Sequence, residues 1–168
     1  MNGALAGAVA AGAWAAQQPL DKRVFATRYD DVELLGKAVT RGAGWALAGT
    51  ALHLANGAAF GAVYALGRPF VPAPPTAVAV GASLAEHLAG WPLATLVDRH
   101  HPARSELETL GGNRRAFAQA AWRHLLFGFV LGELERRLNP ADELEPPGEV
   151  DVSSNGHGNI ERAAVGAA

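Results

Sequence analysis

GAGWALAGTALHLANGAAFGAVYALG (residues 42–67) contains no Lys, Arg, Asp or Glu, and this stretch decides the fold that we expect. As an α-helix rising about 1.5 Å per residue it would be roughly 39 Å long, enough to cross a hydrocarbon core of about 30 Å. The surface helix of a soluble protein needs a charged stripe, and no face of this stretch has one. The stretch therefore predicts a membrane-spanning helix over about 43–66.

Three further segments are candidate spans, although they are less apolar: residues 3–20, 76–97 and 116–135. Together with 43–66 they predict an all-α integral membrane bundle of four transmembrane helices within a domain over 1–138. The acidic, Pro- and Gly-containing segment 139–168 is predicted to be a disordered tail. A soluble Ala-rich helical bundle stays open as the alternative, because the mean hydropathy is only +0.07 and Ala favours helix in any solvent.

One narrow face of the second span repeats in the fourth. His53, Gly57, Gly61 and Tyr64 have the spacing i, i+4, i+8 and i+11, and the same spacing recurs in His124, Gly128, Gly132 and Glu135. The dipeptide Pro19-Leu20 is echoed by Pro92-Leu93 at nearly the same offset. These echoes predict two related two-helix halves that enter the membrane in the same direction.

Six glycines are predicted to lie where helices pack, because a missing side chain allows backbones to approach closely. They are Gly3, Gly7, Gly57, Gly61, Gly128 and Gly132. The alternative reading of the repeated face is that Gly at every fourth position is simply common in packed membrane helices.

Five ionisable residues fall at membrane depth and form a candidate intramembrane polar cluster: His53, Glu86, His87, Arg123 and His124. Their depths predict an ion pair between Glu86 and Arg123. The competing reading has Arg123 extending to the interface and Glu86 protonated. Facing imidazoles of His53 and His124 suit a metal, haem iron or proton relay, whereas hydrogen bonds to carbonyl groups of neighbouring helices would be purely structural.

Composition and motifs exclude several functions. The net charge of -2 gives no indication of nucleic acid binding, and the absence of Cys excludes disulfides, thiolate metal sites and cysteine nucleophiles. Since no catalytic signature is present, we expect no enzymatic activity, catalytic residue, cofactor or resident metal. Asp98-Arg99-His100-His101 has metal-binding residue types, but such loop clusters are usually solvated surface.

The loops 21–41 and 98–115 carry most of the Lys and Arg residues. The positive-inside rule therefore places both loops in the cytoplasm and both termini outside. Asp30 and Glu33, in the charged segment after the first span, have the spacing of a capping box. This spacing predicts that a short interfacial helix starts there and leads into the second span.

The order of several short motifs resembles the YagU-like bacterial inner-membrane proteins over roughly residues 3–138. They are Gly3-Ala4-Leu5-Ala6-Gly7 with Pro19-Leu20, His53 with Phe60 and Tyr64, His87 before Pro92-Leu93, and His124-Leu125 followed by Glu133 and Arg136. The first loop is shorter than in that family, and the tail has no counterpart. The resemblance implies a four-helix, multi-pass protein of the bacterial inner membrane with no established activity.

Two classes of function follow from these features. The first is a structural or accessory membrane protein whose partners are the lipid bilayer and a second copy or another membrane protein, as the Gly-rich faces indicate. The second is a protein that handles protons, ions or small solutes through the intramembrane polar residues, and a haem- or metal-binding bundle is a less favoured variant.

Overall fold

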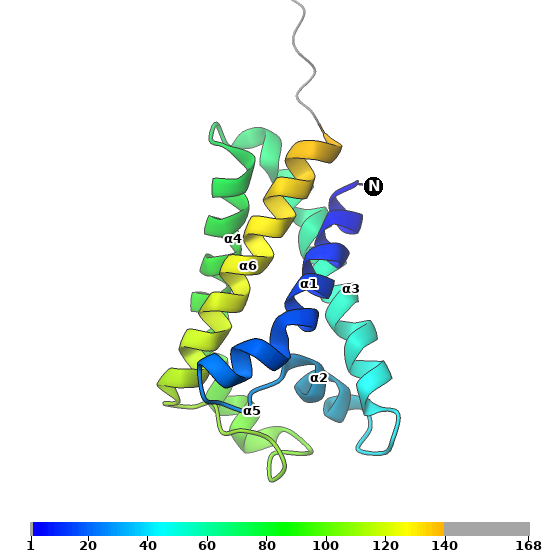
Figure 1. Ribbon diagram of the computed structural model, residues 1–168, viewed down its shortest axis with the longest axis vertical. Coiled ribbons are helices and arrows are strands. Elements are labelled where there is room, and N and C mark those ends of the chain that lie inside the picture. The colour runs from blue at the N-terminus through cyan, green and yellow to red at the C-terminus, as the bar shows by residue number, and fades with distance from the viewer. Residues whose placement is uncertain (1, 140–168) are drawn as a thin grey trace, which may run out of the picture.

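The computed structural model describes residues 2–139, which fold into six α-helices and two short 3-10 helices with no strand among them. The prediction of an all-α fold is therefore confirmed. Four long helices alternate in direction along one axis (Figure 1): α1 (Asn2–Val24), α3 (Trp45–Gly67), α4 (Pro75–Gly90) and α6 (Arg114–Leu138). The predicted tail over 140–168 lies outside the described residues.

The shorter elements lie at the ends of the long helices. Helices α2 (Asp31–Val39) and α5 (Ala94–His100) lie with residues 101–113 at one end, which we call the loop end. The 3-10 helix η1 (Arg68–Phe70) leads toward α4 at the opposite end, where α1 begins and α6 ends (Figure 1). The 3-10 helix η2 (Trp91–Leu93) joins α4 to α5.

Helix pairs form a chain of contacts rather than a closed ring. Helix α1 packs against α3 and α6, and α6 packs against α4, while α2 covers the lower part of α3. In the described part of the chain, α3 and α4 do not form a comparable packed pair. The bundle is consequently open between α3 and α4.

Glycines lie at the closest approaches between helices. A Cβ atom added at Gly57 would lie 2.5 Å from the Ala11 Cβ and 2.6 Å from the Gly7 carbonyl oxygen, which is closer than real Cβ contacts allow. Gly3 and Gly61 contribute to the same α1–α3 contact. On the other side, Cβ atoms at Gly128 and Gly132 would meet the α4 backbone. All six predicted glycines are therefore at helix–helix contacts.

Two helix ends follow from local sequence signals. The Asp30 carboxylate accepts a hydrogen bond of 2.9 Å from the Glu33 backbone N–H and so caps α2, as the capping-box spacing predicted. The Asn113 side chain accepts from the backbone N–H groups of Arg115 and Ala116 and caps α6. Gly112 precedes this cap with φ of +74°, a left-handed conformation that glycine adopts without strain.

Two helices end at other residues than the predicted spans. Helix α4 ends at Gly90 and not at residue 97, because the Trp91–Leu93 segment is a 3-10 helix around Pro92, whose nitrogen cannot donate a helical hydrogen bond. The first helix does not end near Pro19 but continues to Val24, with Pro19 inside it. The lower part of α1 turns aside in Figure 1, as a proline within a helix makes possible.

By length and composition, one described segment is long and apolar enough to cross a membrane: Trp45–Phe70, which comprises α3 and η1 and contains an 18-residue window with a mean hydropathy of 1.2. Helix α1 is rich in Ala and Gly, α4 has 16 residues, and α6 contains several charged residues. Of the four predicted spans, only the one that contains α3 passes this test of length and hydropathy within the described residues.

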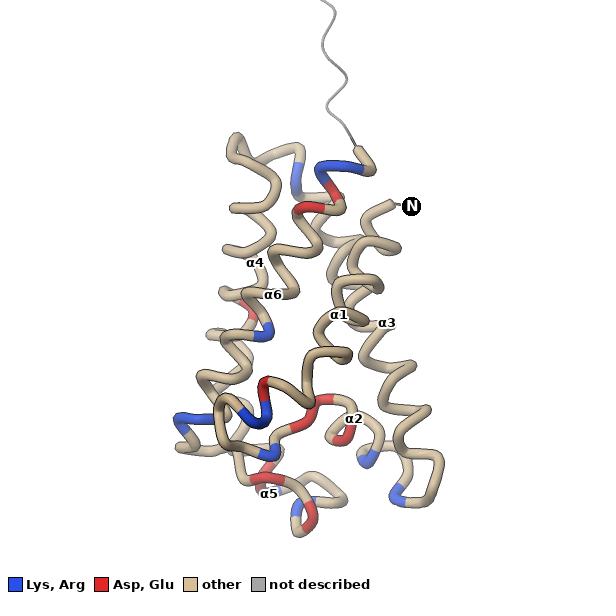
Figure 2. The backbone as a smooth tube through the Cα atoms, in the orientation of Figure 1, with Lys and Arg blue, Asp and Glu red and all other residues tan. Residues whose placement is uncertain are grey.

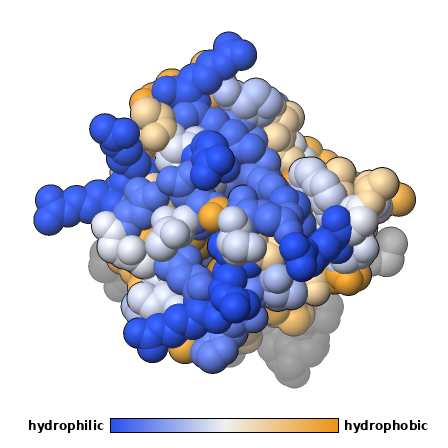
Figure 3. All heavy atoms as spheres, turned by 90° about the horizontal axis from the view of Figure 1, so that it is seen from below, coloured by the Kyte–Doolittle hydropathy of each residue, from blue (hydrophilic) through white to orange (hydrophobic). Residues whose placement is uncertain are grey.

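Charged residues are concentrated at the two ends of the bundle and are sparse along the long helices (Figure 2). Seen from below, the loop end is mostly hydrophilic, with hydrophobic residues toward its rim (Figure 3). Ion pairs join separate segments there, including Lys37 with Glu106 at 3.0 Å and Arg28 with Glu108 at 3.4 Å. Residues 21–41 and 101–113 therefore form one polar cap.

Candidate functional site: a buried ion network beside a cavity

Arg123 lies on α6 and is completely buried. Its Nε and Nη2 atoms donate to the two carboxylate oxygens of Asp21 at 2.6 Å and 2.8 Å. Its Nη1 donates to the Asp31 carboxylate at 2.6 Å, and Nη2 also reaches the Tyr29 carbonyl oxygen at 3.1 Å. The guanidinium thereby fastens α6 to the end of α1 and the start of α2, with the bidentate geometry that suits an arginine–carboxylate pair.

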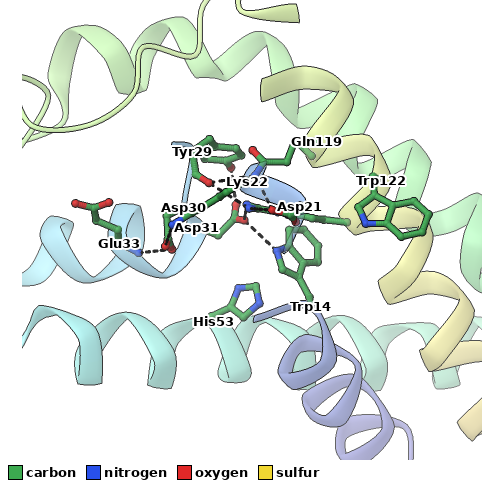
Figure 4. Close-up of polar contacts among 12 residues, drawn as sticks. Trp14, Asp21, Lys22, Tyr29, Asp30, Asp31, Glu33, His53, Gln119 and Trp122 are labelled. Carbon is green, nitrogen blue, oxygen red and sulfur yellow. Dashed lines mark hydrogen bonds and ion pairs between the residues drawn. The ribbon is translucent and has the colours of Figure 1, made fainter. Parts of the chain in front are cut away.

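Uncharged side chains donate further hydrogen bonds to the carboxylates of the two aspartates (Figure 4). The Trp14 indole N–H donates to Asp31 at 3.0 Å and the Tyr29 hydroxyl donates to it at 2.5 Å. The Gln119 amide donates to Asp21 at 2.7 Å. Such saturation is needed because a buried carboxylate without partners is costly.

Electrostatics keep Asp31 ionised. Burial by itself favours the neutral acid, but the Arg123 charge and the hydrogen bonds from Tyr29 and Trp14 outweigh burial and hold the pKa of Asp31 below its usual value. Burial raises the pKa of the Tyr29 phenol well above its usual value, with the Asp31 charge adding to the effect. Tyr29 therefore remains a hydrogen-bond donor.

The expected ion pair between Glu86 and Arg123 was wrong. Among the described residues, Arg123 pairs with Asp21 and Asp31, whereas the Glu86 carboxylate contacts the His124 Nε2 at 2.8 Å. Successive residues of an α-helix are about 100° apart, so Arg123 and its neighbour His124 point in different directions from α6. Glu86 is exposed and meets the second of them.

The metal or haem hypothesis required His53 and His124 to face each other, but the ring contacts of both histidines within the described residues include Trp14 and not one another. The Trp14 ring lies next to both, with centroid distances of 5.2 Å to His53 and 4.7 Å to His124. In residues 2–139 no group of three or more His, Cys, Asp or Glu side chains could hold a metal ion. His53 Nε2 instead contacts the Ala11 carbonyl oxygen of α1 at 3.2 Å, as the structural alternative anticipated.

His87 lies in an aromatic cluster on α4. Its ring centroid lies 4.8 Å from those of His124 and Phe117 and 5.5 Å from that of Trp91. The side chain is 3% exposed, and its Nε2 atom has no hydrogen-bond partner within the described structure. A buried ring nitrogen without a partner is unusual and marks a place where a ligand can supply one.

The predicted polar cluster is thus divided between two places. Arg123 belongs to the ion network, while His53, Glu86, His87 and His124 line a neighbouring cavity of about 320 Å³. Residues of all six α-helices and of η2 line this cavity, and the residues from α3 and α4 flank the gap between these two helices. Asp31 lines the cavity as well and connects the two places.

The loop residues Asp98 and His101 have structural roles. Asp98 accepts hydrogen bonds from the backbone N–H groups of Leu110 at 2.9 Å and Gly111 at 2.6 Å. His101 Nε2 contacts the Leu34 carbonyl oxygen at 3.0 Å, which links this loop to α2. The segment therefore holds the polar cap together.

Sequence reasoning missed the residues that Arg123 binds. Asp21 and Asp31 were assigned to a charged loop, and Trp14, Tyr29 and Gln119 were not singled out. One signal was available in the sequence, since an Arg within a predicted span requires an acidic partner and Asp21 directly follows the first predicted span.

Comparisons of the chain with known protein families, with curated proteins and with solved structures found no match.

Proposed function

We propose that the protein is a four-span membrane protein of the bacterial inner membrane, as the resemblance to YagU-like proteins implies, with a structural or accessory role. The observation that supports this proposal is that the long helices expose large apolar side chains and bury polar ones, the reverse of a soluble helical bundle. Large apolar side chains point outward, including Leu47 and Val63 of α3, Leu5 of α1 and Phe129 of α6. Water would disfavour such a surface on a monomer, whereas lipid accepts it.

The buried polar side chains of α4 and α6 support the same proposal. Gln119, Arg123, Ser83 and His87 are buried within α6 and α4, and much of the remaining core is Ala. Soluble bundles bury their large apolar side chains and expose their charges. In a membrane, small residues at helix contacts and internally paired polar groups are the expected arrangement.

A structural role is favoured over proton or ion conduction by the saturation of the ion network. Arg123, Asp21 and Asp31 have one another and neutral donors as partners, so none of the three is poised to release or accept an ion. The network fastens three segments at the loop end of the bundle. A solute-binding role is the second candidate, and the cavity between α3 and α4 is the observation that favours it.

Matching contacts support the proposal of an internal repeat. Gly61 meets Gly3 in the α1–α3 pair, and Gly132 meets Thr76 at the corresponding place in the α4–α6 pair. Trp14 packs on His53 as His87 packs on His124, at centroid distances of 5.2 Å and 4.8 Å. The residues in these pairs lie 73 positions apart in the first helix of each half and 71 apart in the second, close to the predicted offset.

The membrane proposal predicts that the protein stays in the membrane pellet through washing with alkaline carbonate and dissolves only in detergent. Apolar contact with lipid survives high pH, whereas the ionic contacts of a peripheral protein do not. A known peripheral protein in the same preparation is the control. Recovery of monodisperse protein in detergent-free buffer would contradict the proposal.

The orientation predicts where an impermeant thiol reagent reacts, and the absence of native Cys makes the labelling unambiguous. Ser105 lies at the loop end and Ala73 lies in the connector at the opposite end. In spheroplasts with an intact inner membrane we expect labelling of Ala73→Cys and none of Ser105→Cys until the membrane is opened. The reverse pattern would place the loop end outside.

A further inference from the structure

The cavity between α3 and α4 lies where the chain of helix contacts is open. Glu86 and Leu93 line it and are themselves exposed, so the cavity communicates with the surroundings of the bundle. Its volume of about 320 Å³ lies at the small end of the range for ligand sites and suits a ligand with a single ring. The lining residues from α2, η2 and α5 place the cavity in the half of the bundle nearest the loop end.

The charged residues that line the cavity determine whether a cation or an anion binds there more favourably. Among the described residues that line the cavity none is Lys or Arg, while the carboxylates of Asp31 and Glu86 are both present. Arg123 lies behind Asp31 and shares its charge between two aspartates, so this trio carries one net negative charge when both are ionised. The lining therefore disfavours phosphate or carboxylate headgroups and favours a cation.

Glu86 has free capacity to bind such a cation. One carboxylate oxygen contacts the His124 Nε2, and the other has no hydrogen-bond partner in the described part of the chain. The side chain is 60% exposed, so a ligand can reach it without moving the helices. Both carboxylate oxygens of Asp31, by contrast, already accept hydrogen bonds within the protein. Asp31 therefore acts on a ligand through the negative potential of its charge and not through direct contact.

Aromatic side chains form much of the remaining wall. Trp14, Phe60, Trp91 and Phe127 all line the cavity. Faces of aromatic rings attract ammonium groups, and they do so more strongly where water is excluded. His87 adds a buried ring whose Nε2 lacks a partner, which gives the site a hydrogen-bonding group that no part of the described protein satisfies.

We propose that this cavity binds a monovalent organic cation with an apolar body, such as a protonated arylalkylamine or a quaternary ammonium compound, which enters from the bilayer between α3 and α4. The cation pairs with Glu86 and packs on the aromatic wall, while Asp31 supplies negative potential. The proposal rests on the membrane placement proposed above and gives its second candidate function, solute binding, a chemical class of ligand.

The test compares two ligands of the same shape on the full-length protein in a neutral detergent. Benzyltrimethylammonium carries the positive charge, and neopentylbenzene replaces its nitrogen by carbon. Titration is followed by the fluorescence of the Trp residues, two of which, Trp14 and Trp91, line the cavity, and protein-free micelles correct for partitioning. We expect saturable binding of the cation and at least about tenfold weaker binding of the neutral compound.

Two variants locate the site. Glu86→Gln keeps the shape of the side chain and is expected to weaken binding of the cation about tenfold. Glu133→Gln is the matched control, because Glu133 is a carboxylate of α6 that is paired with Arg136 and Arg137 outside the cavity, and its affinity should not change. Equal affinities for both ligands, no saturable binding, or equal effects of the two variants would overturn the cation site.

The failure of this inference is distinguishable from the failure of the membrane proposal. A protein that resists the carbonate wash but binds neither ligand would refute the cation site alone. A protein that dissolves without detergent would refute the membrane placement, whatever it binds.

Discussion

Replacing Arg123 by Met is expected to lower the free energy of unfolding in detergent by about 3–5 kcal/mol, the largest effect of any single change that we predict. Met fills a similar volume but leaves Asp21 and Asp31 without their shared cation. Asp21 is 2% exposed, so water cannot replace the guanidinium without opening the bundle. Unfolding by titration with a denaturing detergent, followed by circular dichroism, measures the loss.

Two further variants test the cause of this loss. Arg136→Met removes an exposed guanidinium whose partner is the surface residue Glu133, and it should change the stability little. Adding Asp21→Asn and Asp31→Asn to Arg123→Met removes the stranded charges and should restore part of the stability, because a neutral core is often as stable as a buried ion network. If Arg123→Met and Arg136→Met have equal effects, Arg123 does not hold the bundle together.

Gly57→Ala is expected to destabilise the bundle by about 1–3 kcal/mol through overpacking. Its new methyl group would lie 2.6 Å from the Gly7 carbonyl oxygen, which belongs to the backbone and cannot rotate away. Helices α1 and α3 would have to separate. The melting temperature in detergent is expected to fall accordingly.

Gly81→Ala is the matched control for this substitution. Gly81 lies within α4, and a Cβ atom there would meet nothing within 4 Å. Because Ala is the better helix former by up to about 1 kcal/mol, this variant should be neutral or slightly stabilised. A fall in the melting temperature as large as that of Gly57→Ala would mean that the glycines act through helix propensity and not through close packing.

Local signals in the sequence were enough for the helical framework. The uncharged stretch 42–67 predicted α3 to within a few residues, and the spacing of Asp30 and Glu33 marked the start of α2. These features depend on residues within one or two turns of each other, so a single sequence contains them. The interior Pro19 and the break at Pro92 were harder, because proline is compatible with either a kink or an end.

The partners of the buried charges were decided only by the tertiary structure. Depth along the helices suggested Glu86 for Arg123, but depth does not fix the direction in which each side chain points around its helix axis. Asp21 lies 102 residues from Arg123 in sequence and Asp31 lies 92 residues away. Local patterns carry no information about contacts at such separations.

By itself, then, the sequence determined which segments are helical, where glycine permits close approach, and which ionisable residues fall among apolar ones. The tertiary structure decided that Arg123 binds α1 and α2, that Trp14 packs against both His53 and His124, and that the bundle is open between α3 and α4. The physical reason is that helix formation is local, whereas the rotation and pairing of helices depend on the packing of all of them together.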